Sequence, residues 1–441
     1  MDPELLDELI DWLRIPSVST EGGDGPALAA AAEWAVRRVR DAGGSAEAVV
    51  IGDGNPLVVG ELPGPDPDAP TVLIYGHYDV QSPGPEALWT TPPFQPEVRD
   101  GRLYARGASD DKGNFLPLLH VACAMARAGE LPVNVRVLVE GEEEANGEAV
   151  STWLRGDERG ADAAIVFDSH MADPRTPAVT VGLRGMVAVG VTVRTAERNL
   201  HSGMYGGAAL NALHVLHGIL GRVLPDRDGR VPEPLRAGVR EPAPAERESW
   251  KRLQPGDEAL AEVGGRPVSP AAGAEFYERT GAQPALDVNF AGGGERRTVV
   301  PPVAEAAITL RLAPGQDPAA MRAELERLLR SDVPDGAELE LEFHTASPAF
   351  FDVDEPALRL AGEALERACG VAPVFVRSGG SIPIVAEMAE RGYPVIVGGF
   401  GLADDAIHAP DESFSLRSLE WGAAAARELF ASLSALPRRG R

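Results

Sequence analysis

Short apolar runs alternate with helical segments along the first part of this chain, and this alternation constrains its fold more than any other feature. Residues 71–75, 133–139 and 163–167 form apolar runs rich in β-branched side chains, and helical segments are predicted at 27–42 and 115–128. Strands that alternate with helices form a mostly parallel sheet covered by helices on both faces. The sequence therefore predicts an α/β domain.

The pattern changes near residue 184. Residues 186–194 and 306–312 alternate apolar and polar side chains, as half-exposed strands do, and a helical segment covers 318–330. From residue 348 on, short strands and helices alternate again. These shifts predict a larger domain made of 1–183 and 348–441, and an inserted, smaller α+β domain made of 184–347. Within the insertion, residues 225–275 differ in composition and begin with a loop-like, peripheral stretch, and we predict no role for them.

Composition excludes several kinds of protein. The 441 residues include 67 acidic and 41 basic side chains, and the net charge of −26 argues against binding nucleic acid or an anionic membrane through bulk charge. Cys123 and Cys369 are the two cysteines, so neither a disulfide framework nor a cysteine-rich zinc module can form. The acidic N-terminal stretch does not resemble a signal peptide, and no apolar run reaches ~18 residues. We therefore expect a cytoplasmic protein.

Polar residues collect directly after the apolar runs and before one predicted helix. In open α/β sheets, functional sites form at the carboxyl ends of the strands. Each position taken alone also suits a turn, a helix cap or a solvated acidic surface. Together they supply nitrogen and oxygen ligands without sulfur, a set suited to zinc, manganese or cobalt. The positions are His77, Asp79, Asp110, Asp111, Glu142, Glu143, Glu144, Asp168 and His408.

This ligand set predicts a two-metal hydrolase. Two cations that share a carboxylate, ~3.5–4 Å apart, can polarise a carbonyl group and activate a water. A spare carboxylate would then serve as the general base. A carboxylate-rich phosphoesterase is an alternative, but it would need a basic clamp for its anion, and the sequence offers little beyond Lys112 and Arg377.

Motifs spread over nearly the whole chain carry a resemblance to a known family. The chain resembles the di-zinc metallopeptidases that include carnosine dipeptidases, aminoacylases and glutamate carboxypeptidases. Among these it is most similar to the cytosolic non-specific, carnosine-type dipeptidases. The motifs are IPSVS at 15–19, GHYDVQ at 76–81, RGASDDKG at 106–113, EGEEEANGE at 140–148, FDSH at 167–170, GLRG at 182–185, LHSGMYGG at 200–207, RTVVP at 297–301, RLAP at 311–314, SGGSIP at 378–383 and DDAIHAPDE at 404–412.

The resemblance assigns two metal sites that share one residue. It implies that His77 and Asp168 hold one cation, that Glu144 and His408 hold the other, and that Asp110 bridges the two. It also implies a cis peptide bond after Asp110. The two cations per subunit would be zinc, with manganese or cobalt as alternatives.

The resemblance also assigns roles to residues around the metals. Asp79 would orient His77, and Glu143 would be the general base, whereas Glu142 falls at a variable position and is interpreted as solvated. An aspartate at position 168 is typical of the dipeptidase and aminopeptidase branches. This favours a substrate with a free amino terminus.

Further roles fall in the inserted domain and near residue 380. The resemblance implies that His201 reaches the active site of a partner subunit and hydrogen-bonds the oxyanion there. This predicts a homodimer formed through the inserted domain, which would act as a lid and dimerisation domain beside the catalytic di-metal domain. The residues implied to contact substrate are Thr298, offered across the dimer, Arg311 and Ser381, which hold the terminal carboxylate with the Gly380 backbone nearby, and Asn289, which lines the same pocket.

The predicted reaction is hydrolysis of the peptide bond of dipeptides or short peptides, in which Glu143 activates a metal-bridging water. Small peptides and a second copy of the chain are the expected partners, with no nucleic acid and no membrane. The alternatives are an N-acyl amino acid deacylase, an amidohydrolase acting on a modified dipeptide, and a non-catalytic metal-dependent binding protein. The last would lack Glu143 or a ligand, and all of these residues are present.

Overall fold

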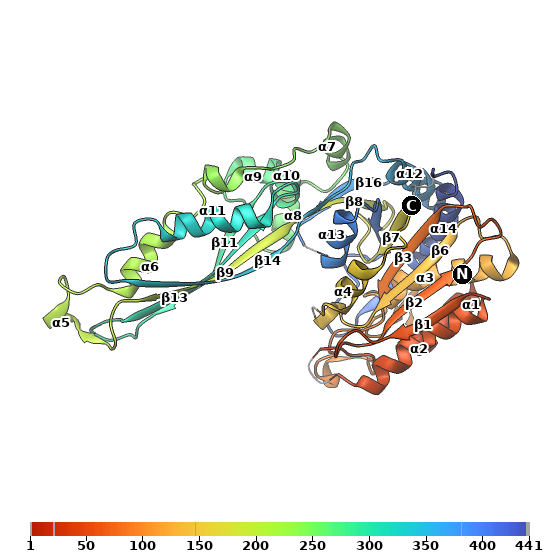
Figure 1. Cartoon of the computed structure of the whole chain (residues 1–441), viewed down its shortest axis with the longest axis horizontal. Coiled ribbons are helices and arrows are strands. Elements are labelled where there is room, and N and C mark those ends of the chain that lie inside the picture. Colours follow the sequence, from red (N-terminus) through yellow and green to blue (C-terminus); the bar gives the residue numbers. More distant parts are fainter. Residues whose placement is uncertain (1, 21–22, 146, 381, 438–441) are drawn as a thin grey trace. The chain divides into compact units, whose positions relative to one another are not determined.

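The computed structural model describes residues 2–20, 23–145, 147–380 and 382–437, and the chain divides into two compact units (Figure 1). Unit 1 is made of the chain up to Val181, of Phe351–Phe375 and of the chain from Glu387 on. Unit 2 is made of Gly182–Phe350 and Val376–Ala386. The stretch Val376–Ala386, which the sequence places in the larger domain, thus groups with unit 2.

A large mixed sheet has most of its strands in unit 1, whereas β15 and the end of β8 that pairs with it belong to unit 2. Its strand order is β1-β2-β6-β3-β7-β17-β8-β15, and β16 pairs with β8. The four central strands β6, β3, β7 and β17 are parallel, and the pairs on either side of them are antiparallel. The strands are β1 (Ser45–Val49), β2 (Leu57–Leu62), β3 (Thr71–His77), β6 (Asn134–Glu140), β7 (Ala163–Phe167), β8 (Ala178–Leu183), β15 (Ala349–Phe350), β16 (Val374–Ser378) and β17 (Val395–Gly398).

Helices flank this sheet. The helix α2 packs on β1 and β2 through a row of alanines, which let the helix approach closely, while α3 packs on β3 and α12 on β17. The α/β fold class is therefore confirmed. The helix α3 begins earlier than predicted, at Lys112, so Pro117 lies inside it. The helices are α1 (Pro3–Leu13), α2 (Gly25–Asp41), α3 (Lys112–Ala128), α4 (Ala149–Gly156), α12 (Pro356–Cys369), α13 (Pro383–Glu390) and α14 (Leu416–Leu433), with the 3-10 turns η1 (Glu86–Leu88) and η2 (Glu143–Ala145).

Unit 2 is built on a four-stranded antiparallel sheet of order β11-β13-β9-β14, with α6 and α11 packed against it (Figure 1). The alternation in β13 explains this packing, because every second residue from Ala304 to Leu312 is buried in the unit 2 core, and Arg311 lies on the opposite face. The elements are β9 (Gly185–Arg194), β11 (Ala285–Gly293), β13 (Val303–Leu312), β14 (Glu338–Ala346), α6 (Ala212–Leu220) and α11 (Pro318–Arg330).

The stretch without a predicted role, residues 225–275, contains several short helices of unit 2 joined by loops. These are η3 (Glu233–Arg236), α7 (Pro244–Trp250), α8 (Gly256–Glu262) and α9 (Pro270–Ala274), and α10 (Phe276–Gly281) follows them. The sequence predicts a peripheral loop at the beginning of this stretch, but η3 and α7 interrupt that loop. The structure buries Glu246 of α7 completely.

Two small sheets complete the fold. One pairs β10 (Leu200–His201) with β12 (Val299–Val300), beside the short helix α5 (Ser202–Tyr205). The other joins β4 (Glu97–Arg99), β5 (Arg102–Tyr104) and β18 (Ser413–Ser415). Among the described helices, none is both long and apolar enough to span a membrane.

Candidate metal centre

The predicted metal ligands converge at one edge of the unit 1 sheet. Because β3, β6 and β7 run parallel, their carboxyl ends lie side by side. The loop that follows the fourth parallel strand, β17, and the segment that precedes α3 reach the same edge. The side chains brought together in this way are His77 at the end of β3, Glu144 in η2 after β6, Asp168 after β7, Asp110 before α3 and His408 after β17.

These five residues form two overlapping groups around Asp110. His77, Asp110 and Asp168 form one, and Asp110, Glu144 and His408 form the other, with the ligand atoms of each group within 4.8 Å of one another. One carboxylate oxygen of Asp110, Oδ1, lies 3.0 Å from Nε2 of His77, and Oδ2 lies 3.0 Å from Nε2 of His408. This is the arrangement that a carboxylate shared between two cations requires.

The chemistry of the donor set fits two divalent cations. Nitrogen and carboxylate oxygen without sulfur suit zinc, manganese or cobalt. The peptide bond between Asp110 and Asp111 is cis, as the resemblance implied.

Electrostatics point to bound cations as well. Desolvation, followed by the negative charge of Asp110, raises the pKa of Asp168 to about 8, and desolvation also raises the pKa of Glu143. Burial lowers the pKa of His77, but hydrogen bonds to Asp110 and Asp79 outweigh it, so the net pKa lies well above the ordinary value. Crowded carboxylates hold protons because they repel one another, and a bound cation would displace those protons.

Asp79 organises both sides of the cluster. The side chain is fully buried, and its Oδ1 lies 3.4 Å from Nδ1 of His77, while the backbone oxygen of Asp79 lies 3.0 Å from the same nitrogen. Its carboxylate also accepts hydrogen bonds from Ser19 Oγ and from the backbone N–H groups of Glu143 and Glu144. Asp79 therefore orients His77 and fixes the start of η2 at the same time.

Two neighbouring acidic residues after β6, Glu142 and Glu143, lie in different surroundings. The carboxyl group of Glu143 lies within the field of His77, Asp110 and Glu144, and no hydrogen bond to its carboxyl group is seen among the described residues. Glu142, which the sequence analysis interprets as solvated, is half-buried, and its Oε1 accepts a hydrogen bond of 2.7 Å from the backbone N–H of Asn55. Glu142 thus fixes this acidic segment to the loop that carries Asn55, while the carboxyl group of Glu143 is not engaged in this contact.

Glu412 lies in a sequence motif, but sequence reasoning assigned it no role. Its carboxylate is buried, pairs with Arg106 at 2.6 Å, and accepts hydrogen bonds from the backbone N–H groups of Gly107, Ser109 and Asp110. It therefore holds the segment that carries Asp110. The one signal in the sequence that could have identified Glu412 is its position four residues after His408, a predicted ligand.

The loop that carries His408 is held in an uncommon backbone conformation. Ala406, His408 and Asp411 all have positive φ, at 55°, 62° and 59°, where residues other than glycine are rare. The Asp411 carboxylate accepts hydrogen bonds from the N–H and the hydroxyl of Thr90, which pins this end of the loop. Such outliers persist when their surroundings determine them, and they concentrate at functional sites.

The remaining predicted residues belong to unit 2, and Ser381 lies outside the described residues. His201 and Thr298 are neighbours, since β10 pairs with β12 and the Thr298 carbonyl accepts hydrogen bonds from Ser202. The His201 ring is exposed, and its Nδ1 accepts from the backbone N–H of Gly203 at 3.1 Å. These contacts leave the other ring nitrogen, Nε2, without a described partner.

Two predicted substrate residues lie on neighbouring strands of the unit 2 sheet, where Arg311 pairs with Ala285, four positions before Asn289. Arg311 on β13 and Asn289 on β11 lie on paired strands, and Asn289 accepts a hydrogen bond from the Thr309 hydroxyl. Arg184, which the sequence did not single out, is buried close to Arg311. Burial and then the charge of Arg311 lower the pKa of Arg184 to about 10. Gly380 is exposed and donates its N–H to Ser378 Oγ.

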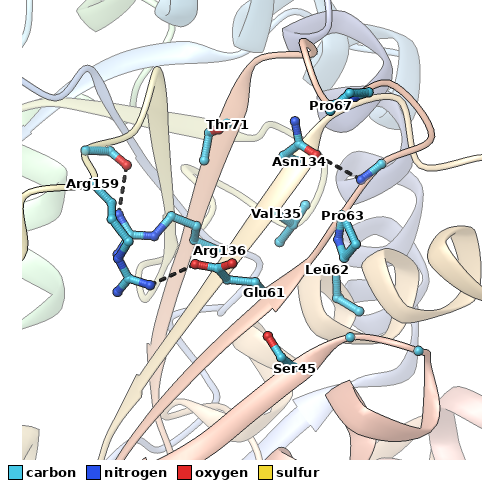
Figure 2. A pocket seen from close by; sticks show the side chains of 14 residues that line it. Ser45, Glu61, Leu62, Pro63, Pro67, Thr71, Asn134, Val135, Arg136 and Arg159 are labelled. Carbon is cyan, nitrogen blue, oxygen red and sulfur yellow. Dashed lines mark hydrogen bonds and ion pairs between the residues drawn. The ribbon is translucent and has the colours of Figure 1, made fainter. Parts of the chain in front are cut away.

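A cavity of about 470 Å³ lies elsewhere in unit 1, at the opposite end of the sheet (Figure 2). It is lined by the first residues of β3 and β6, Thr71 and Asn134, whereas the predicted metal ligands lie at or after the last residues of these strands. Its charged groups are already paired, because Arg159 contacts Glu61 and Arg136 donates to the Gly160 carbonyl (Figure 2). This cavity is therefore separate from the metal centre.

Comparison with known proteins decides the family. The sequence profile described as "Peptidase family M20/M25/M40" matches residues 73–432, which include all five predicted ligands. The chain belongs to this family. The resemblance seen in the motifs is thereby confirmed.

Individual relatives agree with this assignment. The chain is 29% identical over 412 residues to a cysteinylglycine-S-conjugate dipeptidase of Corynebacterium striatum, covering 90% of this chain and 88% of the relative. The crystal structure of human carnosine dipeptidase 1 has 25% identity and a TM-score of 0.75, with 98% and 96% of the two chains covered. An M20 family metallo-carboxypeptidase from Sulfolobus solfataricus has 26% identity and a TM-score of 0.83, with 98% and 100% covered.

Proposed function

We propose that the protein is a metal-dependent dipeptidase that cleaves the peptide bond of dipeptides or short peptides with a free amino terminus. The observation that carries this proposal is the pair of ligand groups joined by Asp110, with the carboxyl group of Glu143 beside both. The relatives are named a dipeptidase, a carnosine dipeptidase and a metallo-carboxypeptidase. All three names describe the removal of residues from short peptides or peptide ends.

The chain's own residues account for the proton transfers. His77, Asp168, Glu144 and His408 would hold the two cations, with Asp110 between them. The bound cations would polarise the scissile carbonyl and lower the pKa of the attacking water. Glu143 accepts a proton from that water and returns it to the amine that leaves when the C–N bond breaks.

We assign recognition of the terminal carboxylate to Arg311, with Ser381, the Gly380 backbone and Asn289 around it. A guanidinium group can bind a carboxylate through two parallel hydrogen bonds. The neighbouring positive charge of Arg184 supports this assignment, because two close guanidinium groups repel each other and an anion relieves that repulsion. A clamp on the carboxylate would also exclude long peptides.

Several finer features belong to the same proposal. We propose zinc as the metal, a homodimer formed through unit 2, and His201 donating a hydrogen bond to the oxyanion in the partner's active site, with Thr298 beside it. The exposed ring of His201, whose Nδ1 is already occupied, supports this role. Unit 1 would be the catalytic domain and unit 2 the lid and dimerisation domain. The two free cysteines are compatible with a cytoplasmic location.

The test is amine release from an alanine-containing dipeptide and from its N-acetylated twin. Metal-stripped enzyme would be assayed with zinc or with manganese added back. We expect cleavage of the free dipeptide alone. Cleavage of the acetylated twin alone would assign the protein to the deacylases, and no cleavage of either with both metals would contradict the proposed substrate class.

A further inference from the structure

The segment Leu235–Trp250 contacts two separate places that adjoin residues to which the proposed function assigns the substrate carboxylate. One is the turn directly after Arg311, and the other is Arg377, directly before Ser378–Gly380. We call this segment the brace. All of these residues belong to unit 2.

The first attachment of the brace is a set of backbone hydrogen bonds. The buried amide of Gln316 donates to the carbonyls of Leu235 and Ala237, at 3.0 and 2.9 Å, and accepts from the N–H of Ala313. The N–H of Arg240 donates to the carbonyl of Pro314 at 2.8 Å. The brace is thus fixed to the chain two to five residues beyond Arg311.

The second attachment is a buried ion pair. The side chains of Glu246 and Arg377 are both inaccessible to solvent, and Arg377 Nε and Nη2 donate to the two Glu246 oxygens at 2.6 and 3.0 Å. Arg377 Nη1 donates to the carbonyl of Arg240, and the N–H of Ala243 donates to Glu246 Oε1. A two-point pair of this kind fixes orientation as well as distance.

The pair leaves Arg377 little freedom to move. A side chain at Gly281 would approach the Arg377 Cβ to 2.7 Å, and one at Gly182 would approach its Cγ to 3.1 Å, so the stem of Arg377 is closely packed. Its guanidinium group lies over the ring of Phe350, where Arg240 of the brace also lies. Ser378, the next residue, is held through its carbonyl by the N–H of Arg184.

From this geometry we infer that the brace sets the position of Ser378–Gly380 relative to Arg311, and that Glu246 is the positioning residue that does so through Arg377. The inference rests on the proposed function, in which Arg311 and the Gly380 backbone contact the substrate carboxylate. It assigns residues 235–250 to substrate affinity. Glu246 itself need not touch the substrate.

The experiment compares Glu246→Gln with Glu241→Gln. Glu241 lies in the same brace but is exposed and pairs with Arg247 at the surface. Each variant is assayed on a dipeptide with a free carboxylate and on its C-terminal amide, with Arg311→Ala in parallel. We expect Glu246→Gln to raise KM for the free dipeptide by ~10-fold or more, to leave its kcat within about threefold, and to change KM for the amide much less. We expect Glu241→Gln to behave as wild type.

Two outcomes would overturn the inference, and they differ in whether the proposed carboxylate clamp survives. If Arg311→Ala separates the free dipeptide from the amide and Glu246→Gln does not, the brace has no positioning role while the proposed clamp stands. If neither variant separates the two substrates, the clamp itself is wrong. Because Glu246→Gln leaves a buried cation unpaired and can impair folding, Glu246→Asp is the second variant. Glu246→Asp keeps the negative charge and should raise KM for the free dipeptide by a smaller factor. An equal rise in KM for the free dipeptide and for the amide would count against the inference.

Discussion

Asp110 is the residue on which the proposed chemistry depends. Its two oxygens face different histidines, and its backbone N–H is held by Glu412. The side chains around it are acids and histidines whose protons compete with cations for the same lone pairs. Proton transfer and metal binding should therefore both depend on the protonation of these residues.

Replacement of Glu143 by glutamine should abolish turnover without removing the metals. The amide keeps the size of the side chain but cannot accept the proton of the attacking water, so we expect kcat to fall by ~10²–10⁴-fold. Metal content is measured on the purified variant beside the rate. Glu148→Gln, on an exposed acid nearby, is the control and should keep full activity. A retained rate in Glu143→Gln would mean that another group is the base.

The stabilisation that a metal gives should grow with pH. Because the pKa of Asp168 is raised to about 8, the metal-free folded protein binds a proton that the unfolded chain releases near pH ~4. The free energy of unfolding of the metal-free protein should therefore fall as pH rises from 5 to 8. A bound cation displaces that proton, and displacement is easier at high pH.

The measurement is Tm in a chelator and in excess zinc or manganese, at pH 6 and pH 8. We expect the increase in Tm caused by the metal to be larger by several degrees at pH 8. An increase that does not depend on pH would contradict the assignment of Asp168 as a ligand.

At the scale of elements, strand ends and two loops build the centre. The parallel strands β3, β6 and β7 bring His77, Glu144 and Asp168 to one edge. Asp110 and His408 reach that edge on segments without regular structure, and Glu412 links the two segments. The position of Asp110 relative to His408 therefore depends on a buried carboxylate that belongs to neither of the two candidate ligand groups.

Replacement of Glu412 by glutamine should weaken metal binding. It removes the charge that pairs with buried Arg106, and unpaired buried charges cost ~3–5 kcal/mol of stability. We expect metal affinity to fall by ~10–100-fold, as for other groups that orient ligands. Calorimetric titration of the metal-free variant measures this. Asp404→Asn, an exposed acid in the same loop, should bind metal as wild type does. Unchanged affinity in Glu412→Gln would refute the role of this carboxylate.

At the scale of the whole molecule, the chain consists of two compact units with different sheets. The proposed metal ligands are all in unit 1, and His201 and Arg311 are in unit 2. If His201 serves the partner's site, activity is a property of the dimer rather than of one chain.

Mixed dimers test this directly. His201→Ala and His408→Ala should each be inactive alone. When the two are co-expressed, a mixed dimer contains one site with intact ligands and an intact His201 from the partner. We expect recovery of about a quarter of the wild-type activity if the chains pair at random. No recovery, with mixed dimers shown to be present, would contradict the role of His201 in the partner's site.

The sequence by itself determined the fold class and the kinds of ligand. Apolar runs of strand length, alternating with helical segments, can be buried only in an α/β sheet, and polar residues that follow such runs must lie at its edge. These are local properties of the chain, so the positions of His77, Glu144 and Asp168 after such runs are enough to single them out as candidates.

Local patterns did not decide which of these residues meet. The family resemblance implied the groups around Asp110, and the tertiary structure brings them together. Asp110 contacts His77 and His408, which lie 33 and 298 positions away in the chain, and Glu246 contacts Arg377 across 131 positions. No local pattern encodes such pairs, because they depend on how whole elements pack and on which buried charge needs a partner. For the same reason the sequence left residues 225–275 without a role, and the role that we infer for residues 235–250 rests on this buried pair.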